Sequence, residues 1–126
     1  MLSFPHTLKI FLAVAPTDMR KNHDSLAALV EHVLQENPLS GQLFVFRNKR
    51  ADRIKLLYWD ATGYALWYKR LERGTFRFPV VAEGTTRIDI APSDFLMLLD
   101  GVDLASVKRQ KRFRLPSENN LQNKSA

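Results

Sequence analysis

The chain of 126 residues contains no cysteine. It therefore has no disulfide bond and no cysteine-based zinc site, which is compatible with the cytoplasmic location that we expect. It also lacks an apolar run of the roughly 20 residues that a helix needs to cross a bilayer, so we expect no contact with membranes. The apolar stretch at the start of the chain is short and has no basic residues before it. We interpret it as a strand rather than a signal peptide.

Residues arranged for catalysis are also missing. The five glycines fall at turns or at the ends of predicted elements, so no glycine-rich phosphate loop is present. The three histidines show none of the spacings that bind metals. The acidic residues that a nuclease would need are scattered: Asp18, Asp24, Asp52, Asp60 and Glu72. We therefore predict no catalytic residue, no metal site and no cofactor.

Positive charge is abundant but unevenly distributed. Residues 43–78 hold nine basic and three acidic residues, and residues 108–126 hold six basic and one acidic residue. Between them, residues 79–107 hold one basic and five acidic residues. Such asymmetry indicates what a protein binds rather than how it folds.

Apolar periodicity predicts five strands and two helices. We expect strands at residues 7–14, 43–47, 53–59, 64–71 and 86–90, with a short extended segment at 76–79. A one-sided apolar stripe from Leu26 to Leu34 predicts a helix from Asp24 or Ser25 to about Glu36. A second helix should follow a Ser93 cap, from Asp94 to Asp100. Helix is the competing interpretation for residues 64–74, which contain good helix formers.

These elements predict an α+β fold. We expect a single domain, residues 1–107, with a mostly antiparallel sheet of about five strands packed with two helices on its inner face. Residues 108–126 lack apolar periodicity and predict a flexible basic tail.

The turn at residues 60–63 determines which side chains share a face of the sheet. The turn suits a three-residue hairpin loop, which would place Leu57 near Trp67 and Lys55 near Lys69. Two lysines directly opposite each other repel, and a bound phosphate would relieve this repulsion. A two-residue loop would exchange the faces, so the register stays open.

Residues 43–78, which we call the basic block, also hold both tryptophans and all three tyrosines. Basic strands that carry aromatic rings are typical of nucleic-acid surfaces, because cations neutralise phosphates and rings stack on bases. Rings that fill the core and cations that face water would be the ordinary alternative. The residues that we predict to contact nucleic acid are Arg47, Lys49, Arg50, Arg53, Lys55, Lys69, Arg70, Arg73 and Trp67, with Trp59 and Tyr68 as further stacking candidates.

Four segments occur in order between residues 17 and 74: TDMRK, LFVFRN, LLYWD and LWYKRLERG. Together they closely resemble the TnpB accessory (Orf2-like) proteins of the IS-66 family of bacterial insertion sequences. The resemblance covers about residues 2 to 104, and the chain departs from the family pattern at Asn22, His23 and Ser25. It implies an accessory protein that is encoded beside a separate transposase and is required for transposition. It implies no established catalytic or binding residue.

Two functions are compatible with these observations. The protein binds transposon DNA through its basic and aromatic surface, or it is an adaptor that recruits or activates the cognate transposase or other element-encoded proteins. In the adaptor hypothesis, the acidic residues 79–107 and the helix with Phe95 and Leu99 form the docking surface. One continuous basic surface would favour DNA binding, and clusters that point apart would favour the adaptor. The sequence does not predict an oligomeric state.

Overall fold

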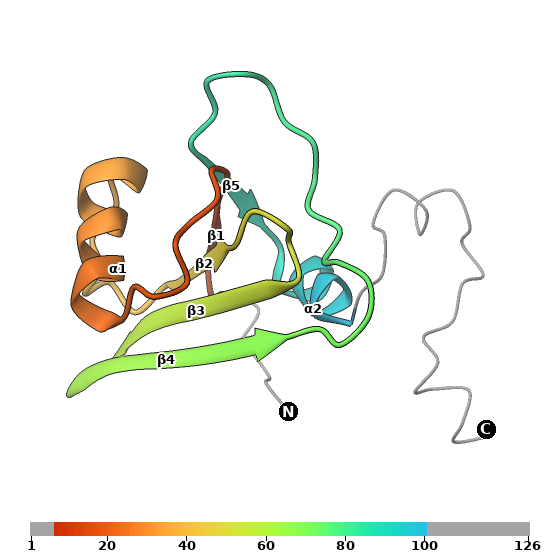
Figure 1. Cartoon of the computed structure of the whole chain (residues 1–126). Helices are drawn as coiled ribbons and strands as arrows, with labels where there is room; N and C mark the ends of the chain where they lie inside the picture. The colour runs from red at the N-terminus through yellow and green to blue at the C-terminus, as the bar shows by residue number, and fades with distance from the viewer. Residues whose placement is uncertain (1–6, 101–126) are drawn as a thin grey trace.

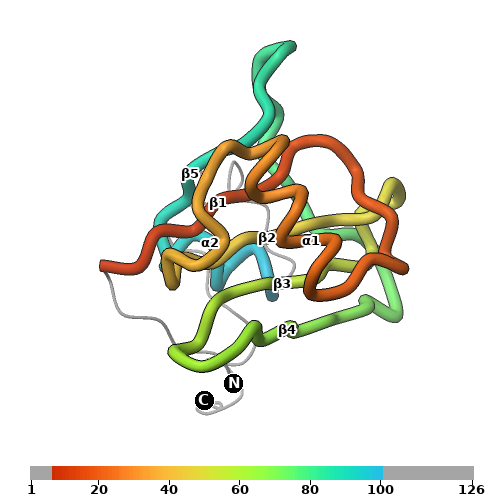
Figure 2. The backbone as a smooth tube through the Cα atoms, turned by 90° about the vertical axis from the view of Figure 1, so that its left-hand side faces the viewer, coloured from red at the N-terminus to blue at the C-terminus, as the bar shows by residue number. Residues whose placement is uncertain are grey.

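The computed structural model describes residues 7–100 (Figure 1). These residues form one five-stranded sheet in the order β4-β3-β2-β1-β5, with a helix against each face. The mostly antiparallel α+β fold that we predicted is therefore confirmed. Figure 2, seen from the side of α1, shows the strands following one another from β5 to β4. The predicted basic tail lies outside the described residues.

The central strands β1 (Ile10–Ala13) and β2 (Leu43–Arg47) run parallel to each other. The first four residues of each strand are apolar and buried. Such an uninterrupted apolar run is typical of a strand that is covered on both faces. The expectation that both helices pack on one inner face is therefore wrong, because the second face of these strands also needs cover.

The connection between β1 and β2 is helical. It consists of α1 (His23–Leu29) and a π-helix, η1 (Val30–Leu34), which ends at Gln35 in the left-handed conformation with a φ of 56°. The helix begins earlier than predicted, because Asn22 rather than Asp24 or Ser25 is its N-cap. The hydroxyl of Ser25 instead accepts a hydrogen bond of 3.0 Å from the backbone N–H of Asn22. Such a contact satisfies a donor that the helix itself leaves free.

A hairpin forms the sheet edge next to β2. It consists of β3 (Arg53–Asp60) and β4 (Gly63–Arg70), so the strand interpretation of residues 64–70 is confirmed. Asp60 lies opposite Gly63, which leaves a two-residue loop in which Ala61 has a φ of 54°. The predicted three-residue loop, and the register that follows from it, are therefore wrong.

The shift of register changes every pair across the hairpin. Lys55 lies opposite Tyr68 rather than beside Lys69, and Lys69 lies opposite Ile54. Because side chains alternate between the faces of a sheet, Lys55 and Lys69 lie on opposite faces. The two cations that face each other directly are instead Arg53 and Arg70.

A long crossover leads from β4 to the far edge of the sheet. There β5 (Arg87–Ile90) pairs antiparallel with β1, and α2 (Pro92–Leu99) follows. The N-cap of α2 is Ala91 and Pro92 occupies the first turn, so the predicted Ser93 cap is wrong. Proline is favoured there because its missing N–H is one that the helix leaves unpaired. Residues 76–79 belong to no strand.

The two faces of the sheet carry separate cores. Beneath α1 and η1, Leu26, Val30 and Leu34 pack on Phe11, Phe44, Phe46 and Leu57. Beneath α2, Phe95, Leu98 and Leu99 pack on Ile10, Leu12, Leu43, Val45, Ile54 and Leu56. The helix that we proposed as a docking surface is therefore part of the core through these residues. Phe95, Leu98 and Leu99 are therefore not available to a partner, and a docking role of the acidic residues 79–107 stays a prediction.

Candidate nucleic-acid interface

The side chain of Asn48 fixes the turn between β2 and β3. The side-chain oxygen of Asn48 accepts hydrogen bonds of 3.0 Å from the backbone N–H groups of Asp52 and Arg53. Its amide nitrogen donates to the carboxylate of Asp52 at 2.6 Å, and this bond lowers the pKa of Asp52 below its ordinary value. Ala51 adopts the left-handed conformation with a φ of 59°. The turn is thus fixed by its own contacts, and it leaves Lys49 and Arg50 exposed at its tip.

The chain that follows β4 is fastened to this turn. The N–H of Leu71 donates to the carbonyl of Asp52 at 2.8 Å, and that of Phe76 donates to the carbonyl of Ala51 at 2.7 Å. These two bonds hold residues 71–76 against the turn. They bring the two basic clusters of the sequence, residues 47–53 and 69–73, to the same end of the hairpin.

We call the resulting surface the basic end. It comprises the exposed or half-exposed cations at this end of the hairpin: Lys49, Arg50, Arg53, Arg70, Arg73 and Arg77. Arg53 and Arg70 are directly opposite each other across β3 and β4. Like charges in this arrangement are destabilising unless an anion or an acidic side chain lies between them. Glu72 offsets Arg70 with a contact of 3.1 Å, but both side chains are largely exposed, so the pair contributes little.

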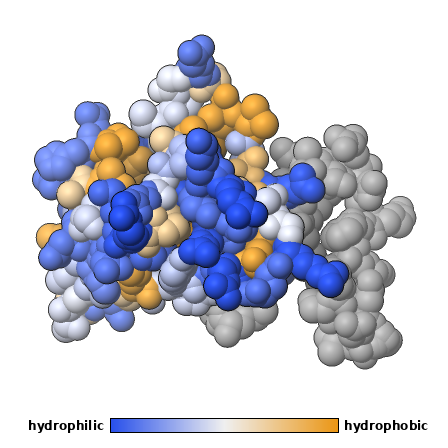
Figure 3. All heavy atoms as spheres, in the orientation of Figure 1, coloured by the Kyte–Doolittle hydropathy of each residue, from blue (hydrophilic) through white to orange (hydrophobic). Residues whose placement is uncertain are grey.

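The basic end borders the loop that precedes α1. This loop and the β2–β3 turn enclose an open hollow of about 550 Å³, lined by residues 16–20 and 48–50 together with Arg53. Figure 3 shows hydrophilic residues gathered over the middle of this face, where the loop and the turn lie. Arg20 donates to both carboxylate oxygens of Asp18, which lowers the pKa of Asp18 to about 2. Arg20 is therefore paired with an acidic side chain, whereas neither Lys49 nor Arg50 forms an ion pair within residues 7–100.

Arg47 serves both the fold and this surface. Its guanidinium donates to the carbonyl of Val14 at 2.7 Å and lies 5.7 Å from the centre of the Phe78 ring. The side chain thus ties the chain after β1 to the crossover. Because these contacts leave Arg47 half-buried, it stabilises the backbone beside the basic end.

Lys55 is not available to a partner. Its side chain is only 4% exposed, and its ammonium donates to the carbonyl of Lys21 at 2.7 Å and to the side-chain oxygen of Asn22 at 3.1 Å. The ring of Tyr68 lies 4.9 Å from the same nitrogen. Lys55 thus holds the start of α1 against the sheet, and it does not belong to the basic end.

Two further candidates lie on the opposite face of the sheet. The ammonium of Lys69 donates to the carbonyl of Leu99, the last residue of α2, at 3.1 Å. Trp67 is half-buried and packs against the core beneath α2. The register of the hairpin places Lys69 and Trp67 on the other face from Arg53 and Arg70, and sequence periodicity had left this register open.

Of the aromatic residues in the hairpin, Tyr68 lies best for contact with the basic end. It is 49% exposed, shares a face with Arg53 and Arg70, and accepts a long hydrogen bond of 3.4 Å from Arg53. Trp59 packs edge-on against Tyr64 with ring centres 5.2 Å apart, near the far end of the hairpin. The rings of the basic block therefore mainly pack inward. Arg77, which we had not assigned to the site, is exposed beside the turn.

The acidic residues do not converge within residues 7–100. No group there of three or more histidine, cysteine or acidic residues has the arrangement of a metal site. Nor is any helix in this part of the chain long and apolar enough to span a membrane.

Comparison with protein families decides what kind of protein this is. The family model described as "IS66 Orf2 like protein" matches residues 8–109. The chain belongs to the IS66 Orf2-like family. This confirms the resemblance seen in the sequence motifs and makes the chain a transposition-associated accessory protein.

Two curated relatives of this IS66 Orf2-like protein come from one bacterium. Uncharacterized protein y4jC of Sinorhizobium fredii is 42% identical over 103 residues, which cover 82% of this chain and 86% of the relative. Uncharacterized protein y4hO of the same organism is 40% identical over 103 residues, which cover 82% of this chain and 88% of the relative. No solved structure matches this chain.

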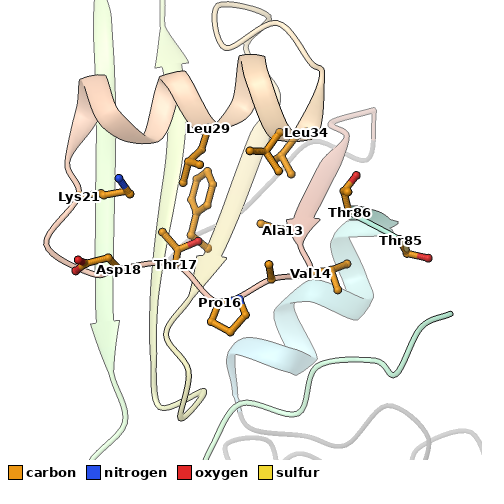
Figure 4. Close-up of a pocket in the computed structure, with 13 residues that line it drawn as sticks. Ala13, Val14, Pro16, Thr17, Asp18, Lys21, Leu29, Leu34, Thr85 and Thr86 are labelled. Atoms are coloured by element: carbon orange, nitrogen blue, oxygen red, sulfur yellow. The ribbon is translucent and has the colours of Figure 1, made fainter. Parts of the chain in front are cut away.

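This Orf2-like protein also has a small apolar pocket beside the basic end. It measures about 290 Å³ and lies between the helical layer and the loop after β1 (Figure 4). Leu29 and Leu34 line it from one side, and Ala13, Val14 and Pro16 line it from the other. Val33, which is 45% exposed, also lines it. Residues 16–18 line both this pocket and the basic hollow, so the two sites are neighbours.

Proposed function

We propose that this protein is a non-catalytic accessory factor that binds transposon DNA through the basic end. The observation that carries the proposal is that the two basic clusters lie side by side, joined by backbone hydrogen bonds from Leu71 and Phe76 to the β2–β3 turn. The exposed cations contact phosphates, and Tyr68 contacts an unstacked base where the DNA is distorted. No direct contact with a base edge follows from this geometry.

The rigid turn makes this surface suited to phosphate binding. Lys49 and Arg50 project from a loop whose backbone is held by Asn48, so little backbone entropy is lost when they bind. Arg53 and Arg70 face each other and repel, and a phosphate that lies between them removes this repulsion and so adds to the affinity. Phosphate contacts of this kind contribute affinity without sequence preference.

A binding titration tests the proposal. The full chain should bind a labelled DNA duplex from the element ends at about 50 mM salt. Arg50→Glu should weaken binding strongly, whereas the matched charge reversal Lys9→Glu, at an exposed residue just before β1, should have a much smaller effect. Absence of binding to duplex and single-stranded DNA at low salt would refute the proposal.

An adaptor that engages the cognate transposase is the second candidate, and the apolar pocket favours it. A pocket of about 290 Å³ has room for one large apolar side chain of a partner, and Val33 lies exposed at its wall. Val33→Glu should then abolish capture of the transposase after nuclease treatment. Leu39→Glu is the matched control, because Leu39 is 53% exposed and does not line the pocket. Equal capture by both variants would eliminate this pocket as the contact.

The non-catalytic character has its own test. We expect transposition to continue when Asp24, Asp60 or Glu72 is replaced singly by alanine. Loss of transposition by a folded variant of this kind would indicate a catalytic carboxylate.

A further inference from the structure

The hairpin strand β4 lies at the border of the sheet. It pairs with β3 on one side, and no other described strand lies on its other side (Figures 1 and 2). With eight residues it is as long as β3. An edge strand of this length presents a row of unpaired backbone groups that readily accept another strand.

One hydrogen bond identifies which backbone groups point outward. The N–H of Leu71 donates to the carbonyl of Asp52, so these two residues form a hydrogen-bonded pair. Hydrogen-bonded and non-bonded pairs alternate along an antiparallel ladder, and the register of β3 and β4 is continuous. The N–H and C=O groups of Tyr64, Leu66 and Tyr68 therefore point away from β3.

The usual protections of an edge are missing from most of β4. Residues 63–68 contain no charge, no proline and no bulge. The other border strand, β5, differs in length and in charge. It has only four residues, two of which are the charged Arg87 and Asp89. Proteins commonly block pairing by short, charged edges, so β4 is the open border of the sheet that residues 7–100 form.

We propose that two copies of this chain associate through β4 and form one continuous ten-stranded sheet. The two β4 strands run antiparallel and are related by a two-fold axis perpendicular to the sheet. This symmetry places the equivalent faces of the two copies on the same side of the joined sheet. The outward-pointing groups then match when Leu66 meets Leu66 of the second copy and Tyr64 meets Tyr68. In this register Lys69 lies opposite Gly63, so no cation opposes another cation.

A second copy fits this edge better than an unrelated strand does. The uncharged stretch is followed by Lys69 and Arg70 at one end only. Antiparallel pairing of the strand with itself moves these charges to opposite ends of the interface. The pairing does not depend on DNA binding. If the function proposed above is also correct, the two copies of Arg70 lie about 27 Å apart along the strands, at about 3.4 Å per residue.

Gly63 offers a matched pair of variants. The space around its Cβ position is open and its φ is not in the left-handed region, so a side chain is tolerated there. Gly63→Glu places a carboxylate opposite Lys69 of the second copy, and Gly63→Lys places an ammonium there. Because the contact occurs twice by symmetry, we expect the dimer dissociation constants of the two variants to differ by about tenfold, with Gly63→Glu the tighter. Within its own hairpin position 63 faces Asp60, which favours the lysine variant, so an effect on folding would have the opposite sign.

Sedimentation of the full chain without DNA, from about 1 to 500 µM, measures these constants. Hydrogen exchange provides the second readout: the amides of Tyr64, Leu66 and Tyr68 should become protected as concentration rises. Those of Ala65 and Trp67, which point to β3, should be protected throughout. A chain that stays monomeric at 500 µM would overturn the proposal. So would a dimer in which the outward amides still exchange rapidly, or in which the two Gly63 variants associate equally.

Discussion

The two cations at the tip of the β2–β3 turn allow the DNA-binding proposal to be tested by charge. Lys49 and Arg50 are exposed, and the hydrogen bonds that hold the turn come from Asn48 instead. The double substitution Lys49→Gln and Arg50→Gln should therefore leave the melting temperature nearly unchanged. It should remove two of the phosphate contacts of the basic end.

The expected magnitude follows from counterion release. Each phosphate contact contributes about −0.9 to the slope of log affinity against log salt for a duplex. If the six cations of the basic end all contact phosphates, the slope is about −5.4, and affinity falls roughly 10³-fold between 50 and 200 mM salt. The double variant should have a slope of about −3.6 and lose roughly 10²-fold over the same range.

Fluorescence anisotropy of a labelled duplex at four salt concentrations measures both slopes. Arg50→Gln alone should reduce the slope by about 0.9, whereas Lys9→Gln, which removes the same charge elsewhere, should leave it unchanged. An unchanged slope in the double variant would refute the reasoning. An equal change in Lys9→Gln would show that net charge, rather than the basic end, determines binding.

Three further predictions concern the fold that supports this surface. Lys55→Met should lower the free energy of unfolding by about 1–3 kcal/mol in denaturant titrations, because it removes the hydrogen bonds of the Lys55 ammonium to the carbonyl of Lys21 and the side chain of Asn22. A reduced salt slope in a variant of normal stability would contradict this. Asp18 has its pKa lowered to about 2 by Arg20, so its contribution to stability is complete above the unfolded value near 3.8 and is lost as pH falls toward 2. Asp18→Asn should flatten the dependence of the melting temperature on pH between 4 and 2, and an unaltered profile would argue against the pair. Phe95→Ala should lower the free energy of unfolding by about 3–5 kcal/mol, because Phe95 is fully buried beneath the sheet. Leu39→Ala, at an exposed residue, should lower it much less in the same measurement.

Much of the fold was predictable because it depends on local periodicity. The apolar runs of β1 and β2 and the stripe from Leu26 to Leu34 each predicted the correct type of element. Boundaries were less accurate where a single cap decides them. Asn22 and Ala91, rather than the predicted residues, precede the helices, because side-chain contacts and a proline in the first turn determine where a helix starts.

The candidate site was predictable only in part. Lys49 and Arg50 are exposed in the turn that the charged segment between two strands predicted. Lys55 is as basic as its neighbours in the sequence, yet it is buried against Lys21 and Asn22. Nothing in its local sequence distinguishes a lysine that holds a helix in place from one that binds a phosphate.

The sequence alone determined the type and order of the strands and helices, the excess of positive charge in residues 43–78 and the membership in the family. The tertiary structure decided the register of β3 and β4, and with it the cations that share a face. A two-residue loop and a three-residue loop leave the same alternating pattern in each strand, so periodicity cannot distinguish them. Packing can, because the observed register packs the buried Leu57 and the partly buried Leu66 against the core beneath α1 and leaves Arg53 and Arg70 at the surface.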